Sequence, residues 1–324
     1  MICLTGATGF LGRHVLRRLL AAGESVRCLV RPHSPGLAWL QTQPAEVVVC
    51  RLEDPAAVSR ALRNARQVIH LAAPVREARD AVVDQFHRDA TACLVEAARA
   101  ARVERFLLVS PIGSDASAGA PFLRGCSIAE ESLRTSGLPY VILQSSLMFG
   151  AGDRLLSGMI RLLRQTGLVV IPGTGATTLQ PIWVGDVVSC LCRSLREEEL
   201  LNRTLPIGGP QHLTFEEIAD QVSQMVNLPR VKLHFSRRAL SWTARLLEGL
   251  GRSPFPGYRH LELLEVGTIT APDAVKRTFG FQPMPLIEGV AYLLTPESEV
   301  RAVRPPRGAE QGAREPRAES REKS

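Results

Sequence analysis

The sequence lacks any apolar run near the roughly 18 consecutive residues that a membrane-spanning helix needs. It also begins directly on the apolar residues of an expected strand, which leaves no segment for a signal peptide. We therefore expect a cytoplasmic protein. Its 324 residues, 45% of them hydrophobic, are enough for a large core and are typical of one globular domain with a subdomain.

Cysteine supplies no cross-linking framework. The seven cysteines are odd in number, scattered along the chain and often set within apolar runs, which favours buried free thiols over disulfides. Cys190 and Cys192 lack the spacing of zinc ligands and have no Cys or His pair nearby to complete a site. The sequence therefore predicts no metal site.

Lysine is scarce, so the net charge of +7 comes almost entirely from arginine. The arginines are spread along the chain and do not form one stripe with interleaved aromatic residues, as a nucleic-acid surface would. The sequence therefore argues against nucleic-acid binding. Part of the excess falls in residues 297–324, which are almost devoid of apolar side chains, and we expect this tail to be disordered.

The N-terminal residues carry the strongest pattern in the chain. An apolar run ends in Gly6, Gly9 and Gly12, and the apolar residues that follow recur at helical spacing. In a strand–turn–helix unit such glycines allow a tight turn, a close approach of the backbone to a pyrophosphate, and close packing of helix on strand. The N–H groups and the dipole of the helix N-terminus attract the phosphates. The predicted dinucleotide-binding residues are Gly6, Thr8, Gly9, Phe10, Leu11 and Gly12.

Strand and helix patterns alternate after this glycine turn. Apolar runs typical of buried strands cover residues 25–30, 46–52, 67–73 and 105–110. This alternation predicts an α/β fold with a doubly wound parallel sheet of the Rossmann type and a small C-terminal α/β subdomain. We expect a nucleotide-binding domain over residues 1–150 and a substrate or partner subdomain over 151–296, of which residues 176–200 return to the first domain.

The residues at the strand ends bear on the choice of cofactor. In this fold the end of the second strand meets the adenosine ribose, where an acidic residue would bind both hydroxyls of NAD. The chain has Arg31 there, and a guanidinium suits a 2′-phosphate, so the sequence favours NADP(H) over NAD(H). A solvated arginine is the alternative. Leu52, Ala72 and Ala73, at the ends of the next strands, complete the predicted cofactor-binding set.

Together these motifs resemble the short-chain dehydrogenase/reductase superfamily in its extended and atypical branches. The resemblance spans residues 1 to about 295. It rests on residues 5–12, 52–55, 70–73, 108–110, 147–153 and 180–187. Within the superfamily the chain looks most like the group that holds the NADPH-binding accessory subunit of respiratory complex I, beside the NmrA-like regulators. A description as NAD-dependent epimerase/dehydratase would suit such a chain.

The resemblance also shows what is missing. Catalysis in the superfamily uses a tyrosine and a lysine four residues later, with a serine from the end of the fifth strand. The aligned positions here hold Phe122 and Cys126, and none of the three tyrosines has a lysine four residues after it. Phenylalanine cannot pass a proton, so the usual general acid is absent. Ser110 is retained as the one candidate catalytic residue, and capping a strand end is its alternative role.

Two functions follow from this mixture. The first is a catalytically impaired NADP(H)-binding protein that acts as a redox sensor or as a structural or assembly subunit. The second is an NAD(P)-dependent reductase, epimerase or dehydratase with a non-standard active site around Ser110. The missing pair favours the first. Residues 237–250 are basic and amphipathic, which suits a protein partner or attachment to the inner face of a membrane, and packing over a substrate cleft is the alternative.

Overall fold

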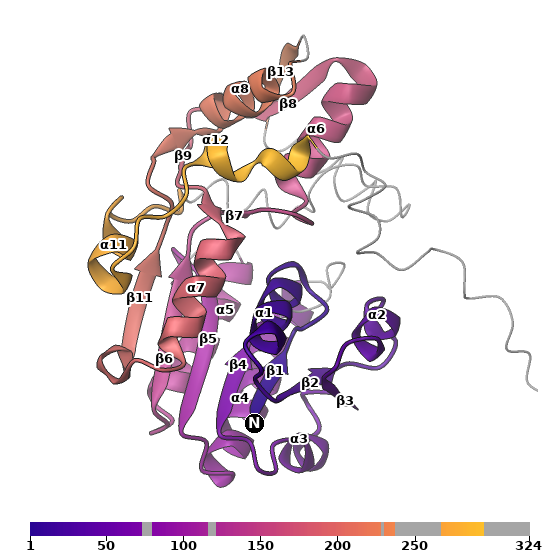
Figure 1. Ribbon diagram of the computed structural model, residues 1–324, viewed down its shortest axis with the longest axis vertical. Coiled ribbons are helices and arrows are strands. Elements are labelled where there is room, and N and C mark those ends of the chain that lie inside the picture. The colour runs from indigo at the N-terminus through magenta and orange to yellow at the C-terminus, as the bar shows by residue number, and fades with distance from the viewer. Residues whose placement is uncertain (73–79, 116–120, 228–229, 237–266, 295–324) are drawn as a thin grey trace, which may run out of the picture.

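A parallel sheet of seven strands organises the first part of the chain (Figure 1). The computed structural model describes residues 1–72, 80–115, 121–227, 230–236 and 267–294. The sheet order is β11-β6-β5-β4-β1-β2-β3. The strands are β1 (Ile2–Thr5), β2 (Val26–Val30), β3 (Glu46–Val49), β4 (Gln67–His70), β5 (Arg105–Pro111), β6 (Tyr140–Ser145) and β11 (Arg203–Ile207). The predicted doubly wound α/β fold is confirmed.

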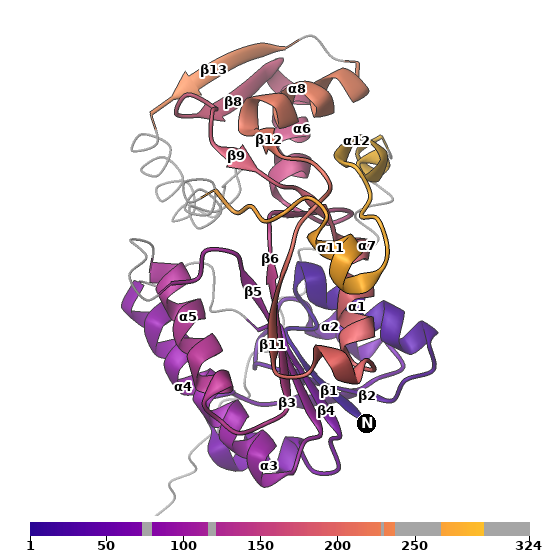
Figure 2. The ribbon, with the colours of Figure 1, turned by 90° about the vertical axis from the view of Figure 1, so that its left-hand side faces the viewer.

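Helices cover both faces of this sheet, as Figure 2 shows. One face carries α1 (Phe10–Ala21), α2 (Leu37–Gln41), α7 (Val184–Ser194) and α11 (Ala274–Phe279). The other carries α3 (Pro55–Ala61), α4 (Asp80–Ala100) and α5 (Pro121–Arg134). Both faces are therefore buried, which explains why the strands are apolar runs and do not alternate with polar residues.

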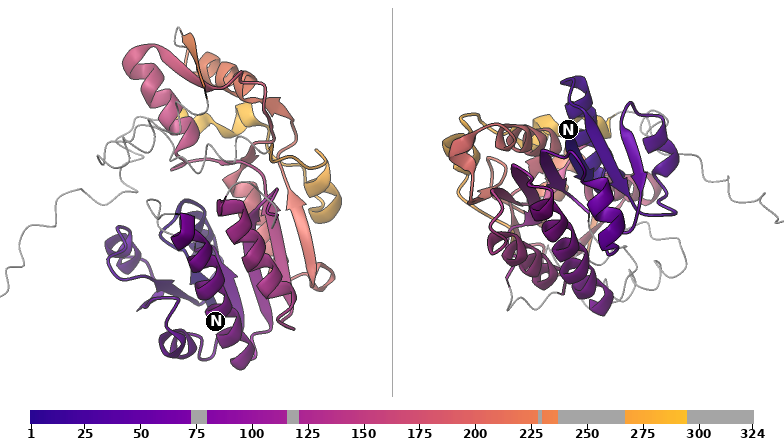
Figure 3. Two further views of the ribbon diagram at one scale, coloured as in Figure 1. Left: turned by 180° about the vertical axis from the view of Figure 1, so that it is seen from behind. Right: turned by 90° about the horizontal axis from the view of Figure 1, so that it is seen from below.

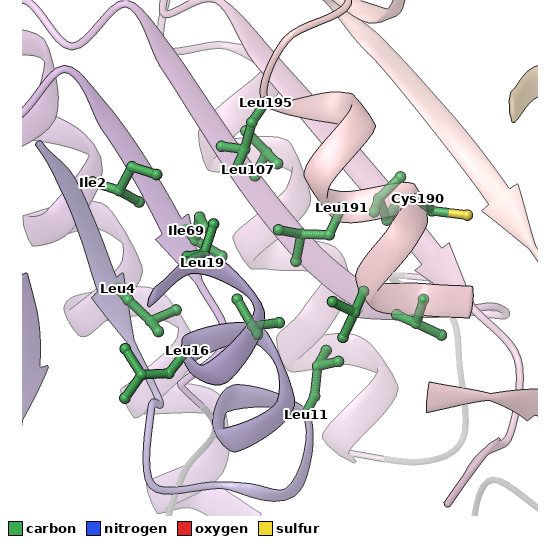
Figure 4. Packing of buried hydrophobic residues seen from close by; sticks show 14 of the residues in the cluster. Ile2, Leu4, Leu11, Leu16, Leu19, Ile69, Leu107, Cys190, Leu191 and Leu195 are labelled. Atoms are coloured by element: carbon green, nitrogen blue, oxygen red, sulfur yellow. The ribbon is translucent and has the colours of Figure 1, made fainter. Parts of the chain in front are cut away.

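Alternate residues of each strand enter different cores. Leu4 and Ile69 pack with Leu16 and Leu191 between the sheet and the α1–α7 layer, as Figure 4 shows. Their neighbour Cys3 points to the opposite core, beneath α3 and α4. This period of two is what a pleated strand imposes. It fixes the register of the sheet and hence the position of each strand end.

A smaller unit lies at the carboxyl end of the strands, visible at the top of Figure 1 and from behind in Figure 3. It has its own core between α6 (Leu155–Thr166) and α8 (Phe215–Met225). Its strands are β8 (Leu168–Pro172) paired with β13 (Val231–Phe235), and β9 (Thr178–Leu179) paired with β12 (Leu213–Thr214). The remaining elements are β7 (Met148–Phe149), β10 (Ile182–Trp183), α12 (Leu286–Gly289) and the 3₁₀ helices η1 (Glu198–Leu200) and η2 (Ala291–Leu293).

The chain passes between the two units more than once. It returns to the large sheet through α7, and then β11 pairs with β6 in parallel from Arg203 to Ile207. That strand lies just beyond the range 176–200 expected to return, so the returning segment is longer than the sequence pattern indicated. Ala73, residues 237–250 and the tail 297–324 lie outside the described residues. No described helix is long and apolar enough to cross a membrane.

Candidate dinucleotide site

Backbone packing dictates the glycines of the turn between β1 and α1. Gly6 has a φ of +73°, and a Cβ on it would lie 2.6 Å from the carbonyl carbon of Leu71. A Cβ on Gly12 would lie 2.0 Å from the Gly6 carbonyl oxygen, and the Gly9 N–H donates to that oxygen at 2.9 Å. A side chain at Gly6 or Gly12 would therefore push the turn away from the sheet or from α1.

The first turn of α1 is open to an anion. Gly9 is the N-cap residue and offers no side-chain acceptor, and the first turn holds no acidic residue. The leading N–H groups of an α-helix have no partner within the helix, and their partial positive charge favours a phosphate. Leu11 is buried in the core with Val15, so at this site only its backbone is available to a ligand.

A polar clip fixes the neighbouring strand end. The Thr5 hydroxyl oxygen accepts from the N–H groups of Leu71 and Ala72, both at 3.3 Å, and lies 2.7 Å from His70 Nδ1. Since two N–H groups already occupy the oxygen, its proton is donated to His70 Nδ1. The clip holds Ala72 against Gly6, between β1 and β4, where the order of strands reverses. Ligands bind at such a switch point in open α/β sheets.

Two arginines lie at the far side of the turn. Arg31 follows β2 and Arg51 follows β3, and the pairing of Val30 with Val49 brings these strand ends side by side. Both arginines are exposed, and neither makes a hydrogen bond or ion pair with another described residue. Leu52, by contrast, is buried in the core beneath α3, so its side chain serves packing.

Sequence reasoning missed a third basic residue. Arg13 Nε donates to the Thr8 carbonyl oxygen at 3.1 Å, and its guanidinium carbon lies 4.5 Å from the centre of the Trp39 ring. Arg17 lies over the same ring at 5.8 Å. A cation in the first turn opposes the helix dipole, and the contacts with Thr8 and Trp39 hold Arg13 there. Its place directly after Gly12 was the available signal.

The loop after β2 packs closely on the glycine turn. A Cβ on Gly36 would lie 2.6 Å from Thr8 Cβ, which only a glycine at position 36 avoids. The Thr8 and Ser34 hydroxyl oxygens are 3.2 Å apart. This contact gathers Thr8, Ser34 and Arg13 near the end of β2. Together with Arg31 they provide hydroxyl and guanidinium donors of the kind that bind phosphate.

At the opposite end of the site, Ser110 is tied to a buried carboxylate. Ser110 is 4% exposed, and its hydroxyl donates to Glu130 Oε1 at 2.5 Å. Glu130, on α5, also accepts from Gln144 Nε2 at 3.0 and 3.1 Å and from Arg134 Nη2 at 2.5 Å. Ser114 Oγ lies 3.0 Å from Ser110 Oγ. The proton of Ser110 is therefore held by Glu130.

No described residue restores the missing acid. Phe122 and Cys126 lie on α5, and Cys126 is buried. Tyr140 begins β6 and lies at the amino ends of the strands, whereas the glycine turn lies at their carboxyl ends. Tyr292 donates to Asp153. Lys232 Nζ is bound to Glu216 and Asp220, both at 2.8 Å, in the smaller unit. No described tyrosine and lysine thus stand together near the site.

The thiols and carboxylates also look structural. All seven cysteines are free, and burial raises the pKa of Cys3 to about 11 and that of Cys28 to about 12, which suppresses the reactive thiolate. Asp186, at the start of α7, accepts from the Met284 N–H at 2.8 Å, and burial raises the pKa of its carboxyl. Among the described residues no group of three His, Cys, Asp or Glu side chains is arranged to hold a metal ion.

Comparison with known proteins agrees with this geometry. Residues 6–150 match the model of an NAD(P)H-binding family. The chain is 26% identical over 292 residues to subunit 9 of the NADH dehydrogenase [ubiquinone] 1 alpha subcomplex of Arabidopsis thaliana, a match covering 87% of this chain and 73% of the relative. The resemblance to atypical short-chain dehydrogenases/reductases that the sequence predicted is confirmed. The family match supports binding of a nicotinamide dinucleotide by residues 6–150.

Two further matches are a curated relative and a solved structure. The photosystem II assembly factor Ycf39 of Cyanophora paradoxa is 28% identical over 243 residues, which cover 73% of this chain and 74% of the relative. The crystal structure of the Citrobacter triphenylmethane reductase complexed with NADP(H) superposes with a TM-score of 0.72 at 20% identity. It covers 90% of this chain and all of that chain, and at this identity it shows a shared fold.

The structure brings most of the predicted site residues together. The turn is lined by Gly6, Thr8, Gly9, Phe10 and the backbones of Leu11 and Gly12. Ala72 lies beside the turn, and Arg31 lies beyond the end of β2. Ser110 lies on β5, two strands from β1, with Glu130 beneath it. Ala73 lies outside the described residues. The roles of these residues in binding and catalysis stay predictions.

Proposed function

We propose that this protein binds NADP(H) and serves as an accessory or assembly subunit of a larger complex, without turning over a substrate. One observation carries the proposal: an intact dinucleotide turn coexists with Phe122 and Cys126 at the positions of the catalytic pair. Loss of a general acid removes a factor of about 10² to 10⁴ in rate. The dinucleotide is then a structural or signalling ligand.

The preference for NADP(H) over NAD(H) is part of this proposal. Arg31 and Arg51 are exposed beside each other, and neither is neutralised by a described carboxylate. Arg13 and Ser34 approach the same place from α1 and from the loop after β2. An additional phosphate on the ribose would be matched by this positive charge, whereas NAD(H) would offer Arg31 and Arg51 no phosphate.

The relatives support the accessory role. One is named as a subunit of NADH dehydrogenase and another as an assembly factor of photosystem II, so both belong to multisubunit systems. Residues 237–250, with their basic amphipathic pattern, are the proposed partner segment, and they would hold the protein at a membrane surface or against another subunit. A redox-sensing version of this role requires that NADPH and NADP⁺ be bound with different affinity.

A reductase with a non-standard acid is the second candidate. Ser110 and Glu130 form a hydroxyl–carboxylate pair of 2.5 Å near the expected position of the nicotinamide. This pair is able to exchange a proton if Glu130 is released from Gln144 and Arg134. The two candidates differ in one outcome, namely whether bound NADPH is consumed.

A titration followed by a turnover assay tests the proposal. NADPH and NADH are titrated into the full-length protein by fluorescence, and the NADPH complex is then incubated with quinones, ketones and sugar nucleotides. We expect tight NADPH binding, weaker NADH binding and no consumption above a protein-free blank. Sustained oxidation of NADPH would overturn the accessory role and favour the reductase.

Two glycine variants control the assay. Gly12→Ala should abolish binding, because its Cβ would collide with the Gly6 carbonyl oxygen at 2.0 Å. Gly23→Ala, just after the end of α1, places alanine at a φ of +75° and should lower stability, but its Cβ meets nothing within 4 Å and it should leave binding intact. Equal binding by the wild-type protein and Gly12→Ala would show that the ligand does not occupy the glycine turn.

A further inference from the structure

The first turn of α1 touches the smaller unit as well as the dinucleotide turn. Phe10 begins the helix, and His14 follows one turn later with its ring edge-on to Phe10, at 5.5 Å between centroids and 81° between planes. Residues four apart lie on the same face of a helix. That face therefore carries two rings directly beside the N–H groups that would receive the pyrophosphate.

A short loop rests on these two rings. We call residues 150–153 the α6 loop, because they run from β7 into α6. His14 Nε2 donates to the Ala151 carbonyl oxygen at 2.9 Å, across 137 residues of sequence. A Cβ on Gly152 would lie 3.9 Å from Phe10 Cδ2, so the Phe10 ring lies next to the loop.

The α6 loop has a backbone that only glycine adopts readily. Gly150 has a φ of +146° and Gly152 a φ of +93°. A Cβ on Gly150 would lie 2.5 Å from Val184 Cγ1, at the start of α7. The loop is thus held in one shape between α1 and α7, and a displacement of either helix would displace Asp153 at its end.

Asp153 joins three parts of the smaller unit. Its Oδ1 accepts from the N–H groups of Leu156 at 2.8 Å and Ser157 at 3.3 Å, which caps the first turn of α6. Its Oδ2 accepts the hydroxyl of Tyr292, which comes from η2 near the end of the described chain. Burial raises the pKa of this carboxyl, so its hydrogen-bond donors are needed to keep it in place.

We infer that the α6 loop transmits dinucleotide occupancy of the glycine turn to the C-terminal subdomain, with His14 as the positioning residue. The inference rests on the proposed dinucleotide binding and adds how that binding changes the C-terminal subdomain. A ligand on the first turn of α1 restrains Phe10 and His14, His14 restrains Ala151, and the loop restrains Asp153 and the start of α6. Coupling between sites is reciprocal, so a loosened α6 loop also weakens binding of the dinucleotide.

Hydrogen-exchange mass spectrometry of the full-length protein, with and without NADPH, tests this. In the wild-type protein we expect NADPH to slow exchange in Phe10–Ala21 and, by about fivefold or more, in Leu155–Thr166. In His14→Leu, which keeps an apolar side chain but has no donor, α1 should still be protected. The effect on Leu155–Thr166 should fall below about twofold.

Two variants make the comparison specific. His212→Leu removes a bond of the same kind, from Nε2 to the Thr270 carbonyl oxygen at 2.8 Å, and should behave as the wild-type protein does. His14→Gln offers an amide donor to Ala151 and should restore the protection. If His14→Leu fails to fold, His14→Asn, whose amide is too short to reach Ala151, takes its place.

The outcomes separate the inference from the function beneath it. Absence of protection in α1 of the wild-type protein contradicts dinucleotide binding and the inference together. Protection in α1 without any in Leu155–Thr166 overturns the inference alone and leaves NADP(H) binding standing. Full protection of Leu155–Thr166 in His14→Leu also overturns it, because the signal then bypasses the Ala151 contact.

Discussion

Ser110 and Glu130 share a hydrogen bond of 2.5 Å beneath the position where superfamily members keep their catalytic machinery. Both side chains are almost fully buried. Ser110 donates to Glu130, and Glu130 collects two further donors from Gln144 and Arg134. These hydrogen bonds join α5, β5 and β6. Because Glu130 holds the proton of Ser110, this proton is not available to a ligand.

This hydrogen-bond network predicts that two substitutions lower stability to different extents. Glu130→Ala leaves three donors without their acceptor and should lower the free energy of unfolding by about 2–4 kcal/mol. Ser110→Ala removes only one donor and should cost about 1 kcal/mol. Urea unfolding followed by circular dichroism measures both. A Ser110→Ala variant that keeps its stability but loses NADPH oxidation would instead favour the reductase.

Cofactor choice depends on Arg31. Arg31→Asp should weaken NADPH relative to NADH by about 10- to 100-fold, because a charge-assisted hydrogen bond is replaced by repulsion. Fluorescence titration of both dinucleotides measures the ratio. Arg60→Asp makes the same charge change at an exposed position on α3, across the sheet from α1, and should leave the ratio unaltered. A parallel loss of both dinucleotides in Arg31→Asp would contradict a 2′-phosphate contact.

Tyr292 should contribute to stability through Asp153. Tyr292→Phe removes a hydroxyl donor from a buried carboxylate and should cost about 1–3 kcal/mol at pH 7. Tyr140→Phe is the matched control, because the Tyr140 hydroxyl has no hydrogen bond to a described residue. Equal unfolding midpoints of the two variants in urea would contradict the role of the Tyr292 hydroxyl.

The cost of Tyr292→Phe should also depend on pH. Burial already raises the pKa of Asp153 above its usual 3.8, and loss of the donor raises it further. The folded protein then takes up a proton more readily than the unfolded chain, so acidification offsets the loss. Unfolding in urea at pH 5 and pH 7 should therefore show the smaller cost at pH 5.

His14 gives a pH effect of opposite direction. Burial lowers the pKa of His14 below its usual 6.5. Below pH 6.5 the unfolded chain therefore binds a proton on His14 more readily than the folded protein does. The contribution of His14 to stability is complete above pH 6.5 and is lost as the pH falls below that value. The stability of the wild-type protein relative to His14→Gln should therefore decrease between pH 7 and pH 5, as thermal melts would show. A constant difference would contradict the burial of the ring.

Local chemistry made part of this structure predictable. The sheet followed from apolar runs that are buried on both faces. The glycine turn followed from the spacing of Gly6, Gly9 and Gly12, although the backbone that excludes a side chain at Gly6 belongs to Leu71. The absence of the catalytic tyrosine and lysine was predictable because Phe122 and Cys126, at the aligned positions, differ from them chemically. In each case a pattern of neighbouring residues was enough to make the prediction.

The rest depends on residues that only the fold brings together. Glu130 meets Gln144 because α5 packs on the end of β6, and nothing in either segment alone indicates the contact. The sequence does not distinguish Arg13 from other surface arginines, because only the fold brings it into contact with the Trp39 ring. His14 and Ala151 are 137 positions apart. The pairing of β11 with β6 was equally hidden, since it joins Arg203 to Val141 across a long stretch of sequence.

The late arrival of β11 and α7 has a consequence for biosynthesis. When the ribosome has made the first 150 residues, β6 is still an open edge and the α7 side of the sheet still exposes its apolar residues to water. Exposed strand edges invite wrong pairing. The sheet of the nucleotide-binding half therefore completes its strands only after residue 207 has left the exit tunnel, and α11 covers the same face later still. A fragment ending near residue 150 should aggregate, even though it contains every glycine of the turn.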